Sequence, residues 1–216
     1  WLNSGVDNSV AAGFQPVPLS CSGSTVVINS AVPSPQTCSG SGSIVVTYSG
    51  GTAPYDIAWT GGSAIGITNP YTITGLVAGA YGITVTDVNG STGTASATIL
   101  YLPVTNTTDN PDTYYATIQA AINAADAGEV ITVCAGTYAE DIIVNEEVSI
   151  LGPNSAIDPC TGVRVGEAIV VPATSAISSG EIFHVAADNV TISGFTIDGN
   201  NPGLTSGYLG TNLADI

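Results

Sequence analysis

The chain has 216 residues, of which 17 are acidic and one is basic, so its formal net charge is −16 at pH 7. With one arginine and no lysine it cannot displace the counterions of a phosphate backbone, which excludes nucleic-acid binding. Apolar residues make up 44% and charged residues 8%, which excludes compositional disorder. No apolar run reaches the roughly 18 to 20 residues that a membrane-spanning helix needs.

The acidic residues divide the chain into two unequal halves. Residues 1–100 contain three of them, and residues 101–216 contain the other fourteen. This change in composition lies beside a polar stretch and predicts a domain boundary near residues 103 to 112. We therefore predict a linker or the end of a preceding module over residues 1–35, a first domain over residues 36–102 and a second over residues 103–216.

Short strands separated by turn residues are predicted along the first domain. Asn89-Gly90 is the strongest hairpin signal, because both central residues of a type I′ turn need positive φ. Strands with turn signals about every ten residues indicate a β-sandwich, with Trp59 and Tyr81 as large core residues. The expected strands are 43–48, 54–59, 71–74, 81–87 and 92–99, and residues 25–28 are a possible first strand.

Three motifs of the first domain resemble an SprB-type repeat: residues 49–59 (SGGTAPYDIAW), 74–81 (TGLVAGAY) and 85–90 (VTDVNG). These repeats are immunoglobulin-like modules of large surface adhesins in gliding bacteria, and the resemblance covers about residues 36 to 99. It implies an immunoglobulin-like β-sandwich. Such repeats usually carry a cysteine directly after the Asp-x-Asn-Gly turn, where this chain has Ser91. The resemblance therefore implies that Cys38 pairs elsewhere, with Cys21 as the only nearby candidate.

The second domain opens with a predicted helix at 115–126, because its apolar residues follow the i, i+3, i+4, i+7 spacing and Gly128 follows. Short apolar segments then recur and predict a parallel β-helix with three strands per coil. The helix is expected to cover the open edge of the first coil. The first set of strands is 131–133, 142–144 and 148–150, the second is 169–171, 183–185 and 190–192, and a third begins at 195–197.

This second domain resembles the N-terminal part of right-handed β-helix proteins of the pectate-lyase-like group. The resemblance lies in residues 116–122 (ATIQAAI), 135–138 (AGTY) and 188–198 (DNVTISGFTID). It implies a fold more than an activity, because the group includes lyases, hydrolases, epimerases and inert stalks. The expected fold class is all-β, an immunoglobulin-like sandwich followed by a short right-handed parallel β-helix with an N-terminal capping helix.

The four cysteines form an even set that divides into two local pairs. None lies in a Cys-x-x-Cys spacing and the chain has one histidine, so a zinc site is not expected. We interpret them as disulfides of an exported protein, and buried free thiols are the alternative. The chain begins without a charged-then-apolar leader, so we expect a mature or internal piece. The candidates are Cys21, Cys38, Cys134 and Cys160.

No residue is expected to act as a catalyst. Arg164 is interpreted as a loop residue that is solvated or paired with Glu167, and His184 as an exposed strand residue. Hydrolases of this fold use paired aspartates, and the nearest candidates are Asp188 and Asp198. Both lie in turns, where a structural role is favoured.

Two groups of side chains are candidates for ligand binding. Acidic pairs flank the strand 142–144, where a solvated face is favoured and a calcium site is the alternative; no other cofactor is expected. Several tyrosines could stack on sugars, and packing at the domain junction is the alternative. The acidic candidates are Glu140, Asp141, Glu146 and Glu147, and the tyrosines are Tyr101, Tyr114, Tyr115 and Tyr208.

These observations indicate a structural or adhesive segment of a large secreted or cell-surface protein, without catalysis of its own. Further domains of the same chain are expected after residue 216, because the third coil fades without a capping element. Surface glycans or other copies in a filament are the expected partners. Two alternatives stay open: an accessory module preceding a β-helix polysaccharide lyase or hydrolase, and a carbohydrate-binding module.

Overall fold

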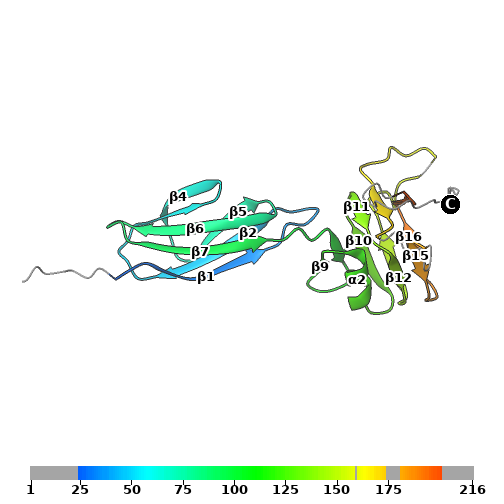
Figure 1. Ribbon diagram of the computed structural model, residues 1–216, viewed down its shortest axis with the longest axis horizontal. Helices are drawn as coiled ribbons and strands as arrows, with labels where there is room; N and C mark the ends of the chain where they lie inside the picture. Colours follow the sequence, from blue (N-terminus) through cyan, green and yellow to red (C-terminus); the bar gives the residue numbers. More distant parts are fainter. Residues whose placement is uncertain (1–23, 159, 174–180, 201–216) are drawn as a thin grey trace, which may run out of the picture.

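The computed structural model describes residues 24–158, 160–173 and 181–200, so Cys21 and Tyr208 lie outside the described residues. Within these ranges the chain is mostly β-structure, and its one helix is α2 (Ile118–Ala124). This confirms the all-β prediction. Figure 1 shows an elongated molecule in which β1 to β7 form one half, and β8 to β17 with α2 form the other.

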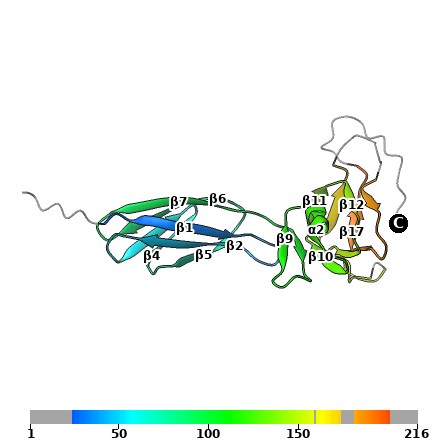
Figure 2. The same cartoon turned by 90° about the horizontal axis from the view of Figure 1, so that it is seen from below.

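Two antiparallel sheets make up the first half. One has the strand order β1-β2-β5 and the other has the order β4-β3-β6-β7. Their strands run along the long axis of the molecule (Figure 2). The bounds are β1 (Val27–Ser34), β2 (Gly42–Ser49), β3 (Tyr55–Trp59), β4 (Gly62–Ile67), β5 (Tyr71–Leu76), β6 (Gly79–Asp87) and β7 (Thr92–Ile99).

The core of the first half lies between these two sheets. Burial alternates along β2, so that Ile44 and Val46 point inward, and along β6, where Ile83 and Val85 do the same. These side chains join Ile57 of β3 in one apolar cluster. Such alternation is what a sheet with one buried and one exposed face requires.

The two predicted large core residues differ in their burial. Tyr81 is buried, as predicted, and its hydroxyl donates to the carbonyl of Val77 at 3.0 Å. Trp59 is only half-buried at the edge of the cluster. Its ring lies against Gly62, where an added Cβ would come within 2.6 Å of the indole. The glycine therefore lets the tryptophan cover the β3–β4 hairpin instead of filling the core.

The first and fourth strands correct the sequence-based boundaries. β1 pairs with β2 along its length, so residues 27–34 belong to the sheet and not to the linker expected over residues 1–35. β4 pairs with β3 through a turn in which Gly61 has φ of 94°. The sequence pattern predicts no strand at β4, because two of its six residues are glycines and one inward side chain, Ile67, is buried.

In the second half, three parallel ladders connect successive groups of strands. The ladders are β10-β13-β16, β11-β14-β17 and β12-β15, and β8 and β9 extend the first of them on its other side. The bounds are β8 (Val104–Asn106), β9 (Thr113–Tyr115), β10 (Glu129–Val133), β11 (Gly136–Ala139), β12 (Ile142–Val144), β13 (Val148–Leu151), β14 (Ala168–Val171), β15 (Phe183–Val185), β16 (Thr191–Ser193) and β17 (Phe195–Ile197).

The pairing register confirms part of the predicted repeat and corrects the rest. Ile142 pairs with Phe183, as predicted. Ile131 pairs with Ile150, however, whereas Ile169 pairs with Thr137 of β11, so the predicted match of 131 with 169 is wrong. The sequence pattern misses β11 because only one of its four side chains is buried. Once β11 is included, the first group of strands is β10, β11 and β12, and the second is β13, β14 and β15.

The helix α2 covers one end of these ladders, but it is shorter than the predicted range of 115–126. Thr117 caps it, with its Oγ1 accepting from the amide of Ala120 at 3.1 Å. Its buried face is part of the apolar cluster of the second half. Ala125 has an extended backbone that ends the helix, so Gly128 lies in the following turn and is not the residue that stops it.

Candidate functional site

The two halves meet at a short connection, residues 100–103. Gln36, which follows β1, lies beside it: the Gln36 amide donates to the carbonyl of Leu100 at 2.9 Å, and the amide of Leu102 donates to the Gln36 carbonyl at 2.9 Å. The side chain of Gln36 also accepts from the amide of Ala78 at 2.7 Å. The connection is therefore held against the end of the first half by backbone pairing.

A disulfide between Cys38 and Cys134 spans the same place. Its Cα atoms are 5.7 Å apart and the two residues are 96 positions apart in the sequence. Cys38 lies between β1 and β2, and Cys134 follows β10, so the bond joins the two halves. We call residues 36–38, 100–103 and 134 the junction.

This disulfide overturns the prediction of two local pairs, and Cys21 is not the partner of Cys38. The partner was missed because it lies in the other half, where sequence proximity gives no signal. Cys160 has a free thiol and is exposed. Of the four candidates, Cys38 and Cys134 are confirmed as disulfide cysteines, while Cys21 lies outside the described residues.

Backbone and side-chain contacts hold Cys134 in place on the second half. Its amide donates to the carbonyl of Pro103 at 3.0 Å, which ties it to the connection. Its carbonyl accepts from the hydroxyl of Tyr138 at 2.9 Å. Burial, with smaller effects from Tyr101 and Glu140, raises the pKa of the Tyr138 phenol, so this hydroxyl keeps its proton and remains a donor.

The far end of the first half is closed by the turn after β6. Asp87 is buried, and its carboxylate accepts from the amides of Ser91 at 2.7 Å, Thr52 at 2.9 Å and Asn89 at 3.0 Å. Burial alone would raise the pKa of Asp87, but these hydrogen bonds outweigh it and lower the pKa. The amide of Gly90 donates to the Asp87 carbonyl at 3.0 Å.

Ser91 stands where the resemblance leads one to expect a cysteine. Its hydroxyl accepts from the amide of Val26 at 3.1 Å, so the position still connects the turn to the start of the first strand. Close by, the amide of Gly51 donates to the carbonyl of Ser24 at 2.7 Å. Hydrogen bonds therefore close this end, and the disulfide lies at the opposite end.

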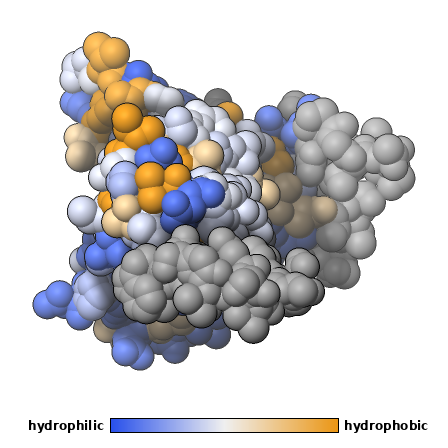
Figure 3. Space-filling view, turned by 90° about the vertical axis from the view of Figure 1, so that its left-hand side faces the viewer, coloured by the Kyte–Doolittle hydropathy of each residue, from blue (hydrophilic) through white to orange (hydrophobic). Residues whose placement is uncertain are grey.

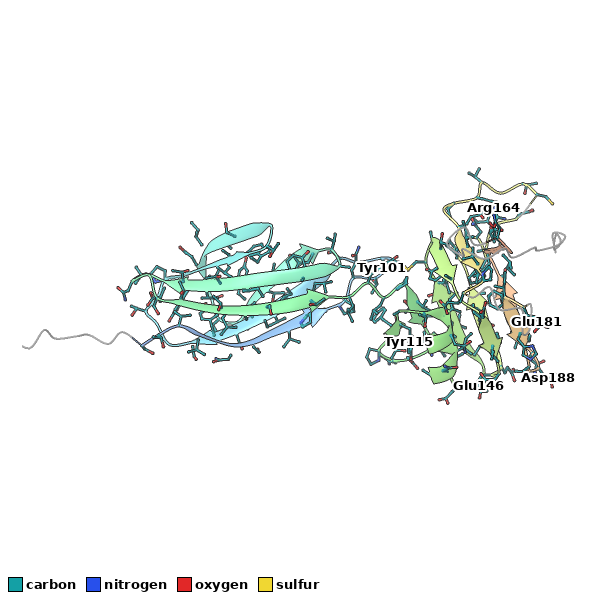
Figure 4. The ribbon with its side chains drawn as sticks, viewed as in Figure 1. Tyr101, Tyr115, Glu146, Arg164, Glu181 and Asp188 are labelled. Atoms are coloured by element: carbon teal, nitrogen blue, oxygen red, sulfur yellow. A yellow bond between two sulfur atoms is a disulfide. The ribbon has the colours of Figure 1, made fainter. Side chains whose placement is uncertain are left out.

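The acidic candidates for a calcium site have different roles. Both oxygens of Glu140 accept from the first amides of α2, Ile118 at 3.0 Å and Gln119 at 2.9 Å. Asp141 accepts from the amide of Ala173 at 3.0 Å. The other two, Glu146 and Glu147, lie in the turn between β12 and β13. Figure 4 shows Glu146 pointing outward. Among the described residues no group of three or more potential ligands is arranged to hold a metal ion, and the calcium site stays a prediction.

The tyrosine candidates divide by exposure. Tyr101 is 43% exposed in the connection and Tyr114 is 40% exposed on β9. Tyr115 packs against the apolar cluster of the second half, and its hydroxyl accepts from Thr113 at 3.1 Å. Figure 4 shows Tyr101 and Tyr115 on the side of the second half that faces the first. Two candidates are thus available on the surface near the junction.

The remaining titratable candidates do not come together. Arg164 pairs with Glu167 at 2.6 Å, as predicted, and hydrogen bonds from Thr196 and then from Arg164 lower the pKa of Glu167. His184 is exposed, as predicted, with its Nδ1 2.6 Å from a Glu181 oxygen. Figure 4 places Arg164 and Asp188 at opposite edges of the second half.

Asp188 and Asp198 also have separate surroundings. Asp188 is exposed in the turn between β15 and β16. Asp198 follows β17, and its carboxylate accepts from the amide of Asn200 at 2.9 Å, so it serves a turn as predicted. Among the described residues, no contact brings either aspartate near a second carboxylate.

The surface at the far end of the first half is mixed in character. Figure 3 views the molecule from this end and shows apolar residues interspersed with polar ones. Exposed apolar side chains of the first half include Ile65 on β4 and Val88 in the turn after β6. No helix among the described residues is long and apolar enough to cross a membrane.

Comparison with known proteins gives one match. A family model described as SprB repeat matches residues 30–64, which run from β1 into β4. No curated protein and no solved structure matches the chain. No family match supports the resemblance to pectate-lyase-like proteins. The SprB repeat is associated with cell-surface adhesin-type proteins, which supports the predicted class of protein and its extracellular or cell-surface location.

Proposed function

We propose that this chain is a structural segment of a cell-surface protein, in which an immunoglobulin-like module of SprB type continues into the start of a right-handed parallel β-helix. The SprB match over residues 30–64 supports the surface location. The three parallel ladders support the β-helix, because the strands of successive groups pair in register along one direction.

The observation that carries this proposal is the disulfide between Cys38 and Cys134. The two halves have separate apolar cores, and the backbone joins them only through residues 100–103. Domains connected in this way ordinarily move relative to one another. A second covalent connection limits such motion, and disulfides persist in oxidising environments outside the cytoplasm. Both properties suit a spacer that holds other parts of a surface protein at a fixed distance.

Labelling of intact cells that produce the protein tests this proposal. Antibodies against the chain are applied before and after the cells are permeabilised, and the thiols of Cys38 and Cys134 are trapped with a membrane-impermeant alkylating reagent. We expect equal antibody labelling in both conditions and alkylation of these two cysteines only after reduction. Labelling only after permeabilisation, or two free thiols, would contradict a surface role.

An adhesive role is a second candidate, favoured by the exposed rings of Tyr101 and Tyr114 near the junction. Aromatic side chains offer flat apolar faces on which sugar rings can stack. A glycan array probed with the purified chain tests this, with Tyr101→Ala and Tyr114→Ala as variants. Ile143→Ala, which truncates an exposed apolar side chain on β12, is the control. Binding that both tyrosine variants lose and the control keeps would support adhesion, and an array without signal would contradict it.

A further inference from the structure

We infer that the Cys38–Cys134 disulfide makes β1 the force-bearing strand of the first half. A pull on the two ends of the chain then bypasses residues 39–133. The inference deepens the proposed function by assigning a mechanical path to the segment. Its physical basis is the covalent connectivity of the described residues, and therefore it is tested independently of where the protein is located.

The first step is the position of β1. At the far end of the first half, Val26 and Ser24 are hydrogen-bonded to the turn after β6 and to the loop after β2. At the other end, Gln36 is paired with the connection. Figure 1 shows β1 running along the length of the first half, toward the second. This strand therefore spans the first half in a single pass.

The second step is that β1 can lengthen very little under tension. A strand already rises about 3.3 Å per residue, close to the limit of a fully extended chain. Tension that enters before β1 and leaves at Cys38 therefore meets a segment that cannot lengthen much. The other six strands of this half are attached to β1 by pairing and packing, and they lie outside the path of the force.

The third step is the transfer of force to the second half. At Cys38 the tension passes through two sulfur atoms to Cys134, directly after β10. From there the chain continues into β11 and the later strands. The connection at 100–103 lies inside the loop that the disulfide closes, so it too is relieved of load. The disulfide therefore shields the part of the first core that lies on β2 to β7, the connection and α2.

Reduction removes this shield. A dithiol supplies two electrons to the sulfur–sulfur bond, each cysteine sulfur takes up one proton, and the dithiol closes to its own cyclic disulfide. Tension must then follow the backbone from Cys38 to Cys134, a separation of 96 residues. Full extension of such a stretch adds roughly 320 to 345 Å of contour length. The predicted difference between the two states is far larger than the folded span of 5.7 Å between the two Cα atoms.

Single-molecule stretching of the full chain tests this inference, with peptide tags at both ends so that no cysteine is used for attachment. We expect the oxidised chain to lack the increment of roughly 320 to 345 Å and the same chain in dithiol to show it. The double variant Cys38→Ser/Cys134→Ser should show it without reductant. Cys160→Ser, which removes a cysteine outside the loop, should behave like the unaltered oxidised chain.

Several outcomes would overturn the inference. Release of the full increment by the oxidised chain, or by Cys160→Ser, would mean that the Cys38–Cys134 bond does not carry the force. An identical trace in dithiol would mean the same. If the double variant does not fold, the comparison of the unaltered chain with and without dithiol still decides. A failed stretching test with a positive surface-labelling result would reject the proposed force path through β1 and leave the surface role intact.

Discussion

Gln119 of α2 pairs with the backbone of Ile143 on β12 as a neighbouring strand would. Its Oε1 accepts from the Ile143 amide at 2.7 Å, and its Nε2 donates to the Ile143 carbonyl at 3.0 Å. An unpaired strand edge is a template for association with other chains. One side-chain amide thus occupies the edge of β12 that faces away from β15. This is how the helix covers the first group of strands, as the sequence predicts.

Loss of this amide should weaken the second half. We expect Gln119→Ala to lower the free energy of unfolding by about 1–2 kcal/mol, because two hydrogen bonds to an accessible strand are replaced by water. Urea unfolding followed by circular dichroism measures the change. Gln119→Glu keeps the size of the side chain but loses the donor, so its effect should be at least half as large. An unchanged midpoint for both variants would show that the pairing contributes nothing to stability.

Asn154 makes a similar pair that protects the loop before β14. It is buried, its Oδ1 accepts from the Val165 amide at 2.9 Å, and its Nδ2 lies 3.4 Å from the Val165 carbonyl. Because the chain has one arginine and no lysine, trypsin can cleave only after Arg164, next to this pair. We expect Asn154→Ala to be cleaved roughly tenfold faster, because local opening becomes easier by about one hydrogen bond.

Mass spectrometry of timed digests measures this rate. Asn145→Ala, in the turn after β12, serves as the control because it leaves the loop unchanged. Equal cleavage of the two variants would mean that Asn154 does not hold the loop closed.

Asp87 should make the stability of the first half depend on pH. Its pKa is lower in the folded chain than in the unfolded chain, where it is about 3.9. The stabilisation is therefore fully present above about pH 4 and is lost as the pH falls through the lower folded value. Asp87→Asn should show a smaller loss of stability on acidification and a lower stability at neutral pH.

Thermal unfolding at a series of pH values checks this dependence. Asp56→Asn is the matched control, because Asp56 lies on the adjacent strand β3 but is exposed and accepts one amide, that of Gly66. If Asp56→Asn reduced the acid sensitivity as much as Asp87→Asn, the turn after β6 would not be its source.

Glu140 should stabilise the start of α2. Its two oxygens accept from the amides of Ile118 and Gln119, which have no acceptor within the helix. We expect Glu140→Ala to lower the free energy of unfolding by about 1–2 kcal/mol, through lost capping and lost negative charge at the helix N-terminus. Glu140→Gln keeps one acceptor oxygen and should cost about half as much. Urea unfolding separates the three proteins, and equal midpoints would contradict the role.

Sequence periodicity predicted most strands, and the repeat spacing predicted part of their pairing correctly, as for Ile142 with Phe183, but not the partner of β14. The alternation in β2 and β6 is strong, because every second side chain enters the core. β11 is invisible to the same test, since Tyr138 is its only buried side chain, and missing it shifted the partner of β14 from β11 to β10. Periodicity reports which face of a strand is buried and carries no information on which strand lies beside it.

The junction was beyond sequence reasoning for a different reason. Cys38 and Cys134 are 96 residues apart, and their proximity depends on how two separately packed halves are placed. Cysteine counts limit the number of possible pairings without choosing among them. Gln36 gave no signal either, because its pairing with the connection uses backbone atoms that every residue has.

The turn that closes the far end of the first half also bears on chemical ageing. An Asn-Gly sequence deamidates when the glycine nitrogen attacks the asparagine side-chain carbonyl, forming a succinimide and expelling ammonia. In this turn the backbone N–H of Gly90 donates to the carbonyl of Asp87, and the backbone N–H of Asn89 donates to the Asp87 carboxylate. Because these hydrogen bonds hold the Gly90 nitrogen, we expect Asn89 to deamidate more slowly in the folded chain than in a flexible peptide of the same sequence.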